Sequence, residues 1–179
     1  MDILLRYYGQ KKMHLFIGVL IVNLIIIWLS KSTLINETVF YNTYSEQLTY
    51  ERSLKLFENL KKYSWIAYAF MPLALLIKFS LISLVLYIGV FLLDFHNKVK
   101  LSSVFGIVVA SESVFVIAGL VKFILFYFFA GNYTLTDLNF FYPFSLINLF
   151  SPGEVNKIWI FPLQTVNVFQ LLYVIFLAY

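Results

Sequence analysis

The chain reads LALLIKFSLISLVLYIGVFLL over Leu73–Leu93 and, after a short polar turn, SVFGIVVASESVFVIAGLVKFILFYFFA over Ser103–Ala130. Both stretches are almost wholly apolar, and each has the roughly 20 residues that an α-helix needs to cross the hydrocarbon core of a bilayer. The turn between them carries Asp94, Lys98 and Lys100. The sequence therefore predicts two antiparallel membrane-spanning helices joined by a short polar loop.

The composition of the whole chain fits a membrane protein. Of its 179 residues 61% are hydrophobic and only 12% are charged, and the mean hydropathy is +0.86. Soluble domains carry roughly 45–50% apolar and about 25% charged residues. The 20 Phe and 13 Tyr exclude a disordered chain. We attribute the net charge of +4 to lysines at membrane boundaries, so the expected partner is the lipid bilayer and not nucleic acid.

Two further spans complete the predicted fold. The first apolar run, residues 13–29, follows basic residues as a signal peptide would, but no small-residue cleavage site follows it. Pro162 opens the last run, residues 163–179, and Pro72 is expected to end an interfacial lead-in, Trp65–Met71. The predicted fold class is an all-α, polytopic transmembrane helix bundle, a single domain over 1–179 with spans at 13–29, 73–93, 103–130 and 163–179.

Two polar outer loops, residues 30–63 and 131–160, separate these spans. Within the first, Tyr44–Tyr63 has the spacing of an amphipathic helix, which either rests on the bundle surface or docks a partner. In the second, Ser151 and Glu154 have the spacing of a capping box, so a short helix is expected to start there. The sequence thus predicts an extracytoplasmic amphipathic helix and a second short helix outside the membrane.

The density of basic residues predicts the orientation. If the N-terminus is inside, the inner loops carry five Lys or Arg residues in a short length of chain. The Lys and Arg residues of the outer loops are spread over a longer stretch and are balanced by Asp and Glu residues. We therefore expect a multi-pass protein with a cytoplasmic N-terminus. The apolar ending Leu177–Tyr179 has no polar flank, and we expect a truncated stretch of a longer protein that continues into a fifth span.

Three charged residues lie inside the predicted spans. An ionised side chain at that depth costs at least ~2.5–3.5 kcal/mol, so it normally pairs, snorkels or serves a function. At ~1.5 Å per residue, Glu112 and Lys78 lie about 16 Å and about 24 Å from the cytoplasmic ends of their helices, and we predict that they form a buried pair. Lys122 lies ten residues beyond Glu112. It is expected to snorkel to the outer interface.

A modest polar lining surrounds the predicted pair. Its members are Asn23, Ser111, Ser113, Gln164 and Asn167, with Gln170 continuing the i+3 spacing of the last two. Such groups often connect membrane helices by hydrogen bonds. The same residues also suit a solute or ion route, or the binding of a partner within the membrane.

Motifs for catalysis, cofactors and metals are missing from the sequence. It has no phosphate-binding glycine loop, no zinc-binding H-E-x-x-H, no cysteine and only two histidines. We therefore predict no catalytic, cofactor-binding or metal-binding residues. The function predicted is a non-enzymatic membrane scaffold or accessory subunit of a larger membrane protein assembly. The alternative is a small transporter or permease component that moves an ion or small solute past Glu112 and Lys78.

Residues 65–179 resemble the Yip1-type membrane proteins. The stretch Phe95–Ser111 is similar to a short loop and the following helix in that family, and Val166–Tyr179 is similar to its penultimate span. Glu112 departs from the family pattern, which has a proline or a small residue there. The resemblance implies a five-span, non-enzymatic integral membrane protein that acts through partners, in eukaryotes in vesicle traffic.

Overall fold

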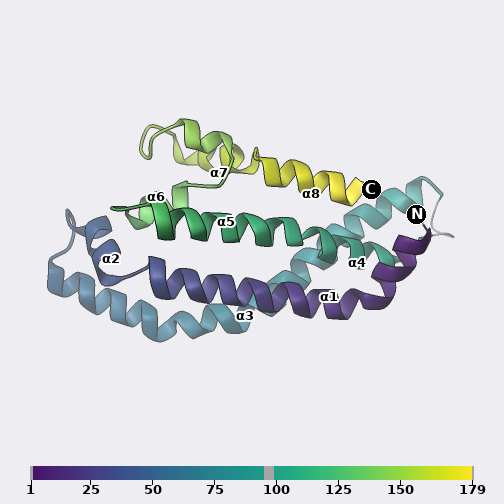
Figure 1. Ribbon diagram of the computed structural model, residues 1–179, viewed down its shortest axis with the longest axis horizontal. Coiled ribbons are helices and arrows are strands. Elements are labelled where there is room, and N and C mark those ends of the chain that lie inside the picture. The colour runs from purple at the N-terminus through teal and green to yellow at the C-terminus, as the bar shows by residue number, and fades with distance from the viewer. Residues whose placement is uncertain (1, 95–98, 179) are drawn as a thin grey trace.

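The computed structural model is an all-α bundle and describes residues 2–94 and 99–178; the predicted turn residues His96, Asn97 and Lys98 lie outside these ranges. No β-strand occurs within the described ranges. The fold class expected from the sequence is confirmed. In chain order, the elements are α1 (Asp2–Leu29), η1 (Ser30–Leu34), α2 (Glu37–Tyr44), α3 (Tyr50–Leu92), α4 (Leu101–Ser111), α5 (Ser113–Phe129), α6 (Leu135–Phe140), η2 (Leu146–Leu149), α7 (Lys157–Thr165) and α8 (Val168–Ala178) (Figure 1).

Within the described residues, three helices are long and apolar enough to cross a membrane. They run over Gln10–Leu34, where α1 passes into the π-helical turn η1, over the 43 residues of α3, and over Leu101–Phe129, where α4 and α5 follow one another. These three helices contain most of the predicted spans 13–29, 73–93 and 103–130. The chain is therefore a helical membrane protein.

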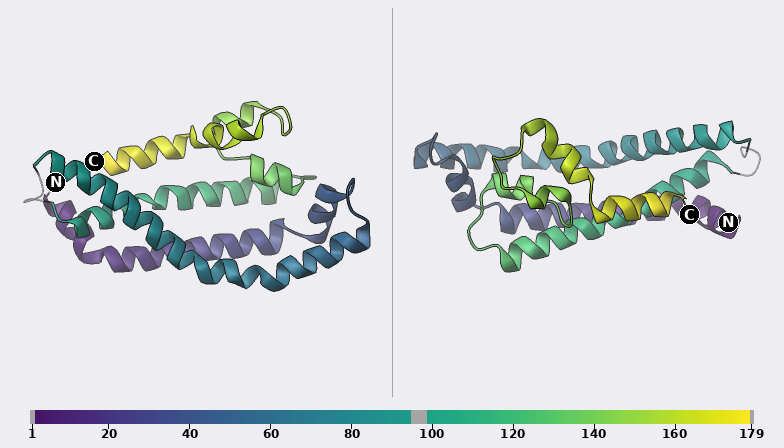
Figure 2. Two further views of the ribbon diagram at one scale, coloured as in Figure 1. Left: turned by 180° about the vertical axis from the view of Figure 1, so that it is seen from behind. Right: turned by 90° about the horizontal axis from the view of Figure 1, so that it is seen from above.

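The predicted break at Pro72 is wrong, because α3 continues through it. Pro72 lies inside a single helix that joins the second part of the predicted amphipathic segment to the predicted span. A proline inside a helix removes one backbone hydrogen bond and kinks the helix, but long membrane helices tolerate it where other groups satisfy the freed carbonyl. Figure 2 shows that α3 bends near its middle. At about 1.5 Å per residue its 43 residues span about 65 Å, so its polar N-terminal part extends beyond one membrane thickness.

The fourth predicted span is not one helix. Residues 163–179 are divided between the end of α7 and α8, which has 11 residues, and the break falls at Val166 and Asn167. There, the Leu146 N–H donates to the Val166 carbonyl at 3.1 Å and the Val168 N–H to the Phe144 carbonyl at 3.3 Å. The chain leaves the helix at this point because its backbone pairs with the preceding loop.

The helix predicted to begin at Ser151 is also wrong. The Ser151 N–H donates to Glu154 Oε2 at 3.1 Å, as a capping box requires, but the contact closes a turn. Gly153 has φ +100°, a left-handed conformation that a right-handed helix does not contain. The helix begins instead at Lys157, where the side chain of Asn156 accepts from the Ile158 N–H at 3.2 Å.

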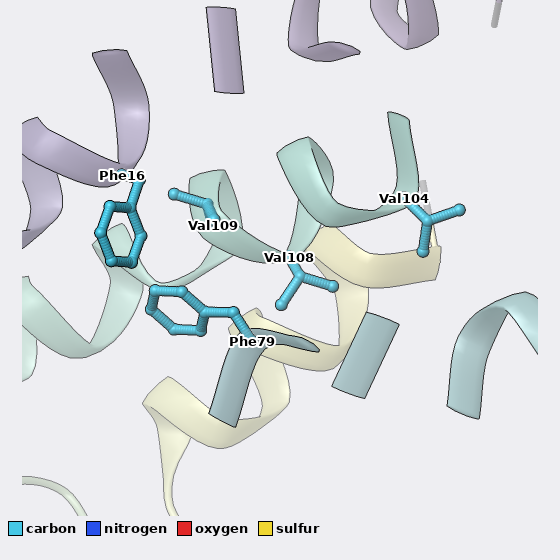
Figure 3. Packing of buried hydrophobic residues seen from close by; sticks show 5 residues of the cluster. All are labelled: Phe16, Phe79, Val104, Val108 and Val109. Atoms are coloured by element: carbon cyan, nitrogen blue, oxygen red, sulfur yellow. The ribbon is translucent and has the colours of Figure 1, made fainter. Parts of the chain in front are cut away.

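The core lies where α1, α3 and α4 meet (Figure 3). Phe79 of α3 is fully buried among Phe16 of α1 and Val104, Val108 and Val109 of α4. Near the start of α4, Lys12 Nζ of α1 donates a hydrogen bond to Ser102 Oγ at 2.6 Å and so links α1 to α4. Elsewhere α3 is open, since only three of its residues are buried, Ser53, Phe79 and Ser83.

A second packed layer joins α8 to α5. Phe169 and Tyr173 of α8 are buried against Val114 and Ala118 of α5. As a result, α8 lies beside α5, and its C-terminal end lies near the end of the bundle where α1 begins (Figure 1). The part of the bundle around the junction between α4 and α5 therefore contacts both α3 and α8.

Candidate functional site

The intramembrane charge pair predicted from the sequence is present. Lys78 Nζ lies 2.7 Å from Glu112 Oε1, a distance at which the ammonium donates a hydrogen bond to the carboxylate. The Glu112 side chain is 6% exposed, whereas that of Lys78 is 44% exposed. The pair thus joins a buried acid at the α4–α5 junction to a base on the open side of α3.

Glu112 sits where the helix is locally distorted. Its backbone stays in the right-handed helical region (φ −59°, ψ −22°), but α4 ends before it and α5 begins after it. The Phe115 N–H donates to the Glu112 carbonyl at 2.9 Å, one residue earlier than in an α-helix. At this tightened turn the Glu112 carboxylate contacts Lys78 of α3.

The serines on either side of Glu112 help to explain the distortion. Ser111 Oγ donates to the Ile107 carbonyl at 2.9 Å, and Ser113 Oγ donates to the Ala110 carbonyl at 2.7 Å. Serine hydroxyls that bond to the preceding helical turn bend helices slightly. Ser111 and Ser113 therefore shape the helix that presents Glu112, and they make no hydrogen bond to the pair within the described residues.

Two aromatic rings lie beside the ammonium group of Lys78. Its Nζ lies 5.2 Å from the ring centroid of Phe115 and 5.8 Å from that of Phe79, within the range of a cation–π attraction. The Phe115 ring in turn lies 4.8 Å from the ring of Tyr173. Tyr173 and Phe115 were not predicted from the sequence, because their place beside the pair depends on how α8 packs on α5.

Some buried polar atoms, two of them at this site, have no hydrogen-bond partner among the described residues. Within residues 2–94 and 99–178, the buried Glu112 Oε2, Tyr173 hydroxyl and Ser145 hydroxyl make no hydrogen bond to the protein. Leaving such a group unsatisfied costs ~1–3 kcal/mol. The carboxylate thus uses one oxygen for Lys78 and keeps the other as a buried acceptor, which is able to take a proton or a hydrogen bond.

The other predicted polar residues do not reach the pair. Asn23 Nδ2 donates to the Val19 carbonyl of its own helix at 2.9 Å. Gln164 Nε2 donates to the carbonyls of Asn139 and Phe140 at 2.8 and 2.7 Å and so fastens α7 to the end of α6. The polar lining expected from the sequence is therefore a set of separate local contacts around one ion pair.

Lys122 is half-buried on α5 and makes no hydrogen bond or ion pair to any residue that the structure describes. That agrees with its exclusion from the Lys78–Glu112 pair. Its snorkelling to the outer interface stays a prediction. Within the described ranges, no group of three or more His, Cys, Asp and Glu residues is placed to hold a metal ion.

Asn167 closes the break between α7 and α8. Its Oδ1 accepts from the Gln170 N–H at 2.7 Å, and its Nδ2 donates to the carbonyls of Gln164 and Thr165 at 2.7 and 3.1 Å. The side chain therefore caps the start of α8 and the end of α7 at once, and it is buried. Its role in the structure is to hold a helix break.

We expect Asn167→Ala to destabilise the protein by about 1–2 kcal/mol, because it removes an N-cap and the hydrogen bonds to the carbonyls of Gln164 and Thr165. Thermal unfolding in detergent micelles measures the effect. Asn139→Ala is the matched control, because that side chain is exposed on α6. Equal melting temperatures for the two variants would show that the break does not depend on this side chain.

Comparisons with protein-family models, with curated proteins and with solved structures found no match to this chain. The resemblance to Yip1-type proteins therefore stays a prediction. Fold and site together define the class of protein: a helical membrane protein in which one ion pair, among the residues that the structure describes, joins two of the spanning helices.

Proposed function

We propose that this protein is a non-enzymatic scaffold or accessory subunit that binds another membrane protein through the face of α3 around Lys78. The observation that carries the proposal is the 44% exposure of the Lys78 side chain. Lys78 lies at the middle of the apolar part of α3, residues 65–92, which puts it about 20 Å from either end at ~1.5 Å per residue. A lysine side chain that is half-exposed at that depth is costly in contact with lipid.

The surroundings of Lys78 on α3 support a helix–helix contact. Leu81 and Val85 follow Lys78 at i+3 and i+7 on the same side of the helix, and they are 58% and 69% exposed. Glu112 satisfies one side of the ammonium group only. A helix of a second membrane protein with a polar side chain or a free carbonyl at this level would cover the rest of Lys78.

The proposal predicts a crosslink at one face of α3. With a photoreactive amino acid at Leu81 in native membranes, we expect a crosslinked product of defined mass whose partner is a membrane protein. The matched control is Ile117, which is 53% exposed on α5. Mass spectrometry identifies the partner, and crosslinks that are absent at Leu81, or equally abundant at Ile117, would contradict the proposal.

A second function is favoured by a different observation, the buried and unpartnered Glu112 Oε2. A carboxylate with a free oxygen inside a membrane suits a protein that passes a proton or small cation, and such residues commonly mark ion pathways. Under this alternative Glu112→Gln abolishes flux in proteoliposomes and leaves the fold intact. The scaffold proposal expects the same substitution to weaken stability or assembly, with no flux to lose.

A further inference from the structure

A groove with a volume of about 1070 Å³ lies far from the ion pair. It is formed by the end of α1, the turn η1, α2, the first part of α3 and α6. Figure 1 shows α2, α6 and the start of α3 together at the end of the bundle opposite the chain termini. Its volume slightly exceeds the range of ~300–1,000 Å³ typical of ligand pockets.

Two helices change from apolar to polar at this groove. In α1 the apolar run ends at Trp28 and Leu29, and Lys31 follows in η1. In α3 the change runs in the other direction, from Lys61 and the residues before it to the apolar run that begins at Trp65. Because both changes occur beside one groove, it lies at the level where the lipid headgroups of a bilayer meet the protein.

The groove combines positive charge with aromatic surface. Lys31 and Lys61 both line it, and Lys31 Nζ lies 4.9 Å from the ring centroid of Tyr68, another lining residue. Trp28, which is 59% exposed, and Leu60, which is 60% exposed, add apolar surface. One carboxylate, Glu37, also lines the groove, at the N-terminus of α2, where the helix dipole stabilises it.

We propose that this groove binds an anionic phospholipid, with the phosphate beside Lys31 and Lys61 and the acyl chains along Trp28 and Leu60. Lysines next to aromatic residues at a membrane boundary attract anionic headgroups by charge, and the apolar surface accommodates the chains. A zwitterionic lipid offers the same chains without the net negative charge. The groove therefore selects by headgroup charge.

The test measures fluorescence from Trp28 alone. Trp65 and Trp159 are the other tryptophans, both well exposed, and Trp65→Phe/Trp159→Phe leaves Trp28 as the single emitter. The protein is reconstituted into two kinds of vesicle with the same ratio of phosphatidylglycerol to phosphatidylcholine. In one kind the phosphatidylglycerol carries brominated chains, which quench tryptophan on contact, and in the other the phosphatidylcholine does.

We expect stronger quenching of Trp28 by brominated phosphatidylglycerol than by brominated phosphatidylcholine. In Lys31→Gln/Lys61→Gln the preference should disappear, because the relative affinity falls about 5-fold for each lysine and on the order of 30-fold for both. The matched control is Lys55→Gln/Lys62→Gln, which removes two exposed lysines of α3 outside the groove and should keep the preference. High salt should reduce the preference without any change to the lysines.

Three results would overturn the proposal. Equal quenching by the two lipids in the parent protein means that a protein segment fills the groove or that lipids contact Trp28 without selection. Loss of the preference in Lys55→Gln/Lys62→Gln means that overall charge controls it. A preference that persists in Lys31→Gln/Lys61→Gln means that these two lysines do not recognise the headgroup.

Discussion

Lys78→Met should destabilise the protein by about 3–5 kcal/mol, because it leaves the Glu112 carboxylate buried without its counter-charge. The carboxylate has one hydrogen-bond partner among the described residues, Lys78 Nζ at 2.7 Å, and its second oxygen has none. Methionine matches most of the volume of the lysine stem, so packing against α4 and α5 is kept and the loss comes from the charge. Reversible unfolding in mixed micelles measures it.

Two controls separate the pair from its surroundings. Lys122→Met removes a lysine from a spanning helix that has no partner in the described chain, and it should be neutral or stabilising. Lys78→Met/Glu112→Gln removes both charges and should cost less than Lys78→Met alone, since no buried charge remains unpaired. If Lys78→Met and Lys122→Met had the same effect, the pair would contribute nothing to stability.

The Lys78–Glu112 pair could be predicted from the sequence because it depends on only two neighbouring helices. Charges are so costly in a span that Lys78 and Glu112 stand out in their apolar surroundings. Their expected depths, about 24 Å and about 16 Å at ~1.5 Å per residue, differ by a gap that a lysine side chain spans between neighbouring antiparallel helices. Lys122 was not expected to pair with Glu112, because ten residues of helix separate the two by about 15 Å. The charges of these residues and their depths in the membrane were therefore sufficient to predict the Lys78–Glu112 contact.

The helix boundaries were less predictable, because hydropathy says little about where an apolar helix stops. The apolar run that begins at Leu163 has no glycine or proline near Val166, yet the helix breaks there. Conversely, Pro72 is a strong local signal for a break, and α3 continues through it. The helix breaks near Val166 because the backbone there forms hydrogen bonds with residues 144 and 146 of the preceding loop. This contact depends on the three-dimensional arrangement and not on the local sequence.

The polar residues of the last segment show the same limit. Gln164, Asn167 and Gln170 recur every three residues, which favours one polar stripe along a single helix. In the structure, Asn167 instead bridges two helices by capping, and its short side chain reaches backbone groups on both sides of the break. Spacing identified unusual residues correctly, but it could not distinguish an interhelical contact from a cap.

Phe79→Ala should also destabilise the protein strongly, by about 3 kcal/mol, because Phe79 packs the otherwise exposed helix α3 against the bundle. Its side chain is 0% exposed, and its ring meets those of Phe16 and Phe105 edge-on at centroid distances of 6.0 and 6.5 Å. Lipid tails are as apolar as a protein core, so the loss comes from van der Waals contacts with α1 and α4 and from the cavity left behind.

Leu81→Ala is the matched control, two residues further along α3 and 58% exposed. Lipid or a partner helix contacts that side chain, so its truncation leaves no cavity in the bundle and should cost less than about 1 kcal/mol. Hydrogen exchange adds a local measure: in Phe79→Ala, amides of residues 73–92 should exchange faster than those of α4, because α3 separates from the bundle first. If Phe79→Ala and Leu81→Ala unfold at the same temperature, the Lys78–Glu112 pair holds α3 in the bundle and the aromatic core does not. In that case the double variant Lys78→Met/Glu112→Gln should separate α3 from the bundle.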